Sequence, residues 1–137
     1  MASFSDAYET KVLEHVAGKT TLTLVTPIFL ALCTAVPTDA STGTTITEAA
    51  YTGYARKGVA AADWAAAVAG TPGSIANGAI ITFAACTAGT STVIGWALCD
   101  ALTVGNVIMW GTCASTVISS TQTPATVAVS ALSLTLD

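Results

Sequence analysis

The chain has 137 residues and a mass of 13.6 kDa, and only 12 residues carry charge: four Lys or Arg and eight Asp or Glu. A compact monomer of this mass exposes about 6,600 Å² and can bury one core, so we expect a single domain over residues 1–137. The net charge of −4 offers no positive surface for a phosphate backbone, which argues against nucleic-acid binding. Disorder is excluded by a hydrophobic content of 53%. No apolar run approaches the roughly 20 residues that span a bilayer, so we expect no membrane partner.

The first predicted element is a short helix within residues 3–18. Phe4, Tyr8 and Val12 recur at every fourth position and form an apolar stripe. Gly18 suits the position that follows a last helical turn. From residue 20 to residue 137 the pattern changes to β-structure.

Seven strands are predicted there, because Val, Ile and Thr dominate short runs between Gly, Pro, Asn and Asp. They cover residues 21–25, 28–35, 54–61, 79–84, 91–99, 106–113 and 126–136. This pattern indicates an all-β fold, a β-sandwich or jelly roll with one N-terminal α-helix. Residues 28–33 are apolar at every position, which predicts that both faces of that strand are covered, one by the core and one by a subunit or the helix.

The last predicted strand changes its phase. Its apolar residues occupy odd positions at 127 and 129 but even positions at 132, 134 and 136. The inward face therefore switches near Ser130, which predicts a bulge or bend. The strand then serves two packing environments, such as the core and a neighbouring chain, or it bends within one core.

No catalytic, cofactor or metal site is predicted. His15 is the only histidine, and no Cys or carboxylate lies at ligand spacing on the same element, so a zinc site is not expected. The sequence has no G-x-S-x-G elbow, dinucleotide fingerprint or phosphate-binding loop. Among the aromatic residues, Trp64 is a weak candidate for stacking on a sugar, whereas Trp96 and Trp110 lie in apolar strands and are assigned to packing.

The four cysteines match no common zinc or redox motif. Each lies in or beside an apolar run, where a free cysteine acts as a small buried hydrophobic residue. A sharper hypothesis is that Cys99 or Cys113 forms a disulfide with a neighbouring chain once the assembly leaves the reducing cytoplasm.

Several segments, taken in order, form a recognisable pattern: Ser3 to Gly18, Phe29 to Asp39, Gly53-Tyr-Ala-Arg56, Ile81-Thr-Phe83, Ile94 to Asp100, Gly105-Asn106 with Trp110-Gly111, and Leu132 to Asp137. Together they resemble a family of small virion proteins of tailed bacteriophages that are often labelled tail-fibre-like. The resemblance covers nearly the whole chain. The four cysteines and the alanine-rich stretch around Trp64 depart from the usual family pattern.

The resemblance implies a non-enzymatic structural protein that decorates and cements the capsid surface. Its expected partners are the major capsid protein and two further copies in a homotrimer, with assembly in the cytoplasm of the bacterial host. The alternative is a tail or fibre component that contacts the host surface. The candidate contact residues are Phe4, Tyr8, Val12, Ile28, Phe29 and Leu30. We expect the few charges to lie on the helix and in loops, since a densely packed surface is best kept free of charge.

Overall fold

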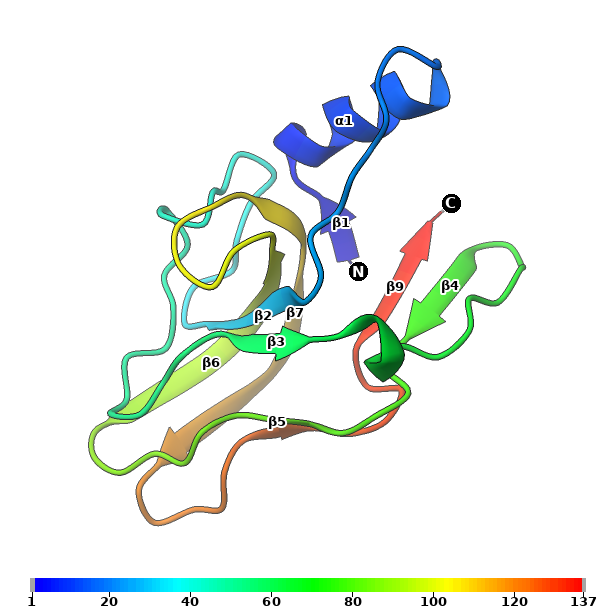
Figure 1. Cartoon of the computed structure of the whole chain (residues 1–137). Coiled ribbons are helices and arrows are strands. Elements are labelled where there is room, and N and C mark those ends of the chain that lie inside the picture. Colours follow the sequence, from blue (N-terminus) through cyan, green and yellow to red (C-terminus); the bar gives the residue numbers. More distant parts are fainter. Residues whose placement is uncertain (1, 137) are drawn as a thin grey trace.

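The computed structural model describes residues 2–136 and confirms an all-β fold with one short α-helix (Figure 1). A five-stranded antiparallel sheet has the strand order β1-β7-β6-β2-β3. Its strands are β1 (Ala2–Phe4), β2 (Ile28–Cys33), β3 (Lys57–Val59), β6 (Thr90–Cys99) and β7 (Val107–Ser119). Two short ribbons complete the strands: β4 (Gly73–Ala76) pairs with β9 (Ser133–Leu136), and β5 (Ile81–Thr82) pairs with β8 (Thr126–Val127).

The helix α1 (Asp6–Val16) is shorter at its start than the sequence predicts. Phe4 belongs to β1, and the backbone N–H of Ser5 still donates to the carbonyl of Ile108, so pairing with β7 delays the first turn. The Ser5 hydroxyl donates to the carbonyl of Val107 and does not cap the helix. At the other end Gly18 adopts a φ of +72°, as its place after the last turn predicts. A single 3-10 turn, η1, spans Ala61–Asp63.

The observed strands differ from the predicted ones in their bounds and number, because a strand forms only where a neighbouring strand pairs with it. Residues 21–25 are rich in Thr, Leu and Val, yet in the described part of the chain no strand pairs with them and they stay irregular. Strand β7 runs six residues beyond the predicted end at 113, because it continues to pair with β6 as far as Ser119. The short strand β4 is not among the predicted strands, because it lies between Pro72-Gly73 and Asn77-Gly78, two pairs that are typical of turns.

Both faces of β2 are covered, as predicted, but by the chain itself. Leu30 and Leu32 point into the main core. Ala31 and Cys33 point the other way, into a second cluster of small residues against which Ile46 packs. The second cover is therefore the long connection between β2 and β3, which supplies Ile46, and not α1, whose strand contacts are mainly with β7 and β1.

The predicted phase change is confirmed as a turn at Ser130, which has a φ of +63°. The turn divides the predicted strand 126–136 into β8 and β9, which pair with different partners. Both packing environments lie inside one chain.

The charges lie where the low charge count led us to expect them. Among the described residues, Lys57 is the only charged residue in any strand. Only uncharged side chains lie on either face of the three longest strands, β2, β6 and β7.

Candidate functional site

An apolar groove lies between the N-terminal part of the chain and the β4–β9 ribbon. We call it the N-terminal groove, and its volume is about 590 Å³. The described residues that line it carry no charge, and Ser74 provides the only side-chain hydroxyl. They are Phe4, Leu24, Ile28, Ala67, Val68, Ala69, Gly73, Ser74, Ile75, Leu98, Ile108, Met109, Leu134 and Leu136. These residues come from β1 and the chain that leads into β2, from β6 and β7, and from β4, β9 and the segment before β4. Figure 1 shows where these elements lie.

The first wall is held by Asp100, which follows β6. Its carboxylate accepts hydrogen bonds from the Tyr8 hydroxyl at 3.2 Å and from the backbone and side chain of Asn106 at 2.7 and 2.8 Å. Burial alone would raise the pKa of Asp100, but the hydrogen bonds from Asn106 and Tyr8 lower it below its ordinary value. Burial, followed by the nearby Asp100 charge, raises the pKa of Tyr8 to about 12. Tyr8 therefore stays protonated and ties α1 to the turn between β6 and β7.

The second wall is held by Asn77, a fully buried amide next to β4. Its Nδ2 donates to the carbonyls of Ala79 and Ala128 at 2.8 Å each, and its Oδ1 accepts from the backbone N–H of Leu132 at 2.9 Å. One side chain thus joins the chain around β4 to the turn that precedes β9. The sequence signalled only an Asn-Gly turn here, because partners about 50 residues away leave no local pattern.

A buried arginine joins the long β2–β3 connection to the β6–β7 turn. Arg56 forms an ion pair with Glu48 at 2.7 Å, and its guanidinium also donates to the carbonyls of Gly43, Ala101 and Val104. Glu48 also accepts from the Tyr54 hydroxyl at 2.7 Å. Every one of these polar groups is therefore engaged in holding the scaffold.

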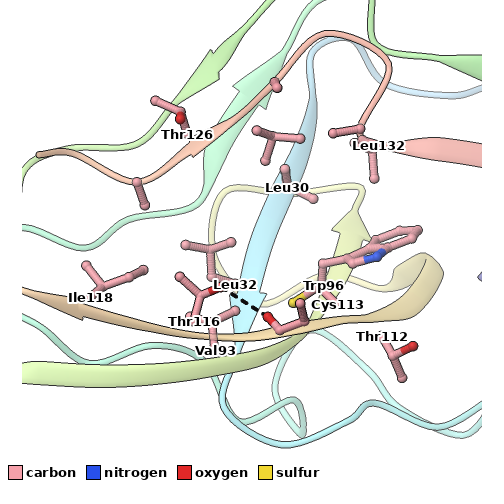
Figure 2. A pocket seen from close by; sticks show the side chains of 15 residues that line it. Leu30, Leu32, Val93, Trp96, Thr112, Cys113, Thr116, Ile118, Thr126 and Leu132 are labelled. Carbon is pink, nitrogen blue, oxygen red and sulfur yellow. Dashed lines mark hydrogen bonds between the residues drawn. The ribbon is translucent and has the colours of Figure 1, made fainter.

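A second hollow, the C-terminal cavity, opens over the same face of the sheet. Its volume is about 540 Å³, and it lies between β6–β7 and the chain from residue 125 to 132 (Figure 2). Figure 2 shows Trp96, Leu32 and Leu132 around it, with Cys113 and Thr116 on the β7 side. Partial burial raises the pKa of the Cys113 thiol, so a smaller fraction of it is the nucleophilic thiolate than for a fully solvated cysteine. The ribbons thus leave the main core face incompletely covered at two places.

The structure divides the predicted contact residues into three groups. Phe4 and Ile28 come together in the N-terminal groove, where both remain partly exposed. Tyr8 and Leu30 are buried in the core of the single chain. The remaining two lie apart from the groove: Val12 is partly exposed on α1, and Phe29 packs on the second cluster.

The cysteines are free, and three of them are buried. Cys99 is fully buried in the single chain, so a disulfide from it to another chain would require the sheet to open. Burial raises the pKa of Cys33 to about 12 and that of Cys99 to about 11. Cys113 alone is exposed.

The two remaining candidate residues, Trp64 and His15, contact other parts of the same chain. Trp64 is partly buried and packs against the main core, which removes it as an exposed sugar platform. His15 accepts a hydrogen bond from the backbone N–H of Leu22 at 3.2 Å. Within residues 2–136, no three His, Cys, Asp or Glu side chains come close enough to hold a metal ion. No helix of the described chain is long and apolar enough to cross a membrane.

The exposed surface of the chain is 7327 Å², about 700 Å² more than a compact monomer of this mass presents. The chain is therefore a small β-rich scaffold with its buried polar groups engaged within the chain, two apolar hollows and excess exposed surface. A family model described as podophage GP4 fiber I protein gp80 matches residues 3–135, and the chain belongs to this family. It is a structural protein of a bacteriophage virion, which confirms the coarser part of the resemblance. No curated protein matches the chain.

Proposed function

We propose that this protein is a fibre component of the phage particle that joins other virion proteins through its apolar hollows. The observation that carries the proposal is the match of a fibre-protein family to residues 3–135, nearly the whole chain. The uncharged N-terminal groove supports it, because an apolar concave surface gains free energy when a partner covers it.

We propose that the role is non-enzymatic. The polar side chains that lie inside the fold form their hydrogen bonds with backbone and side-chain partners of the same chain. These side chains are Arg56, Asn77 and Asp100. The exposed thiol, Cys113, has a raised pKa, which is the opposite of the shift that activates a nucleophilic cysteine.

Capsid decoration is the second candidate, and the exposed, uncharged stretch of β7 from Thr112 to Val117 favours it. A surface without charge can pack densely on a shell with little cost of desolvation. In that role a homotrimer would bind the major capsid protein in the assembled shell and stabilise that state by mass action. A homotrimer is also part of the fibre proposal.

Antibody or gold labelling of purified particles, with a count of copies per particle, separates the two roles. The fibre proposal expects a handful of copies, with the label at the tail or on fibres. Hundreds of copies over the head, together with a loss of heat stability in particles that lack the protein, would replace it with decoration. Absence of the protein from purified particles would overturn both.

A further inference from the structure

We infer that Asn77-Gly78 is a latent modification site. The amide of Asn77 is open to deamidation through the backbone nitrogen of Gly78, and the fold blocks this reaction until the chain around β4 and β9 opens. The reaction converts asparagine to aspartate or isoaspartate and needs only water. The inference concerns the lifetime of the folded chain, so it holds or fails independently of the place of the protein in the particle.

An Asn-Gly pair favours this reaction, because glycine has no side chain to hinder the attack of its nitrogen. The Gly78 N–H loses its proton to water or base, and the nitrogen forms a bond to Cγ of Asn77. The bond from Cγ to Nδ2 then breaks, and Nδ2 takes up a proton and leaves as ammonia. Water opens the resulting cyclic imide at either of its carbonyls, which gives aspartate or isoaspartate without oxidation or reduction.

The folded chain uses every polar atom of Asn77, which is fully buried. Its Nδ2 donates to the carbonyls of Ala79 and Ala128, and its Oδ1 accepts from the N–H of Leu132. Its backbone N–H donates to the carbonyl of Leu132 at 3.1 Å, and its backbone carbonyl accepts from the N–H of Ser130 at 2.8 Å. Turning the amide toward the next residue would therefore break all the hydrogen bonds of the side chain at a buried position.

The nitrogen that would attack is also engaged. The Gly78 N–H donates to the carbonyl of Asp63 at 2.7 Å, so its proton is shielded from base. Asn77 pairs with Trp64 in an isolated antiparallel bridge, which fixes the backbone between the two reacting groups. Partners from other segments thus hold both groups, and the reaction has to wait until these contacts open.

Packing explains why a glycine follows this asparagine. A Cβ added at Gly78 would lie 3.1 Å from the backbone nitrogen of Ala65 and 3.4 Å from its Cα. A larger residue would have to push the two segments apart. The reactive pair is therefore a consequence of the close approach between the chain after η1 and the chain after β4.

The product of the reaction does not fit the folded site. In aspartate an oxygen replaces Nδ2, which lies 2.8 Å from the carbonyl oxygens of Ala79 and Ala128. Acceptors then face acceptors, and a negative charge is buried without a partner. In isoaspartate the main chain passes through the former side chain and becomes longer next to β4, which disturbs its register with β9. We therefore expect a chain that has reacted not to refold.

The first test compares the folded and the unfolded wild-type chain, incubated with reductant at mildly alkaline pH in buffer or in urea. Peptide mapping by mass spectrometry follows Asn77, with Asn106 as the internal control because the branched Val107 hinders the same attack. Asn77 should convert in urea, and at least about 100-fold more slowly in buffer, because the folded chain has to open first. Asn106 should convert more slowly than Asn77 in urea. Equal rates for Asn77 in buffer and in urea would overturn the shielding.

The second test takes samples from urea at intervals, dilutes them and records the fraction that regains native tryptophan fluorescence. This fraction should fall in step with the conversion of Asn77, and Asn77→Asp should not regain it. Gly78→Ala is the matched control, since it hinders the attack and should keep its ability to refold after the same time in urea. If Gly78→Ala does not fold, the refolded fraction of the wild type is mapped instead, and it should contain only intact Asn77. Isoaspartate or aspartate at position 77 in that fraction, or native fluorescence and stability of Asn77→Asp, would overturn the block to refolding.

Discussion

Replacing Arg56 with Met removes the one buried cation among residues 2–136 while keeping a side chain of similar length. Arg56 is 6% exposed. Its Nε and Nη2 donate to Glu48 Oε1 at 3.0 and 2.7 Å. Further donations reach the carbonyls of Gly43, Ala101 and Val104 at 2.6, 2.9 and 2.8 Å. The substitution therefore leaves one carboxylate and three carbonyl groups without these donors.

Removing one partner of a buried ion pair costs about 3–5 kcal/mol. The Glu48 side chain is 23% exposed and keeps its hydrogen bond from Tyr54, so solvent and the hydroxyl offset part of the loss. We therefore expect Arg56→Met to lower the free energy of unfolding by about 3 kcal/mol, near the lower end of that range. For a chain of this size the midpoint of thermal unfolding should fall by about 10 °C.

Urea unfolding followed by tryptophan fluorescence measures this loss. Lys57→Met is the control, because Lys57 is the next residue, has the same charge and is exposed, and it should change stability by less than about 0.5 kcal/mol. Adding Glu48→Gln to Arg56→Met should cost less than the sum of the two single changes, since it removes the unpaired carboxylate. If Arg56→Met and Lys57→Met have equal effects, the ion pair is not what holds the two loops together.

Three further predictions concern other contacts of the scaffold. A Cβ added at Gly43 would lie 1.8 Å from the carbonyl oxygen of Val104, so Gly43→Ala should displace the backbone and cost more than about 2 kcal/mol in urea unfolding; a neutral effect would refute this packing. The pKa of Asp100 is lower in the folded chain than its unfolded value of about 3.9, so the ionised carboxylate stabilises the fold at any pH above that value. This contribution is lost as the pH falls through the pKa of the folded chain. The thermal stability of the wild type should therefore approach that of Asp100→Asn between pH 5 and 2, and a constant difference would contradict it. Cys113 should be the one thiol that reacts with a disulfide reagent in the folded chain, with the other three reacting only in denaturant, whereas two or more fast thiols would show that the core opens.

The elements that could be predicted from sequence are those in which local pattern and tertiary pairing agree. The apolar spacing of Tyr8 and Val12 predicted α1, and apolar and β-branched runs predicted β2, β6 and the first half of β7. The switch from odd to even apolar positions predicted a bend near Ser130, and the structure has a turn there. Each of these signals is a periodicity, which backbone geometry converts directly into structure.

The candidate site was less visible, because its residues come from distant segments. The sequence predicted Phe4 and Ile28 as contact residues and Leu136 as an apolar residue of the last strand, but no pattern pointed to Val68. It also proposed Cys99 for a bridge to another chain, since a strand end can be accessible, whereas the sheet buries this residue completely.

By itself, the sequence of this protein determined a nearly uncharged, β-rich chain with one short helix, because composition and periodicity act within a few residues. Only the tertiary structure decided that residues 21–25 remain unpaired, that Asn77 and Arg56 join segments about 50 residues apart, and that the ribbons leave an open groove. A strand needs a neighbour and a buried polar group needs a partner, and both are chosen by how the chain packs. The groove is the gap that this packing leaves, so no local pattern could have marked it.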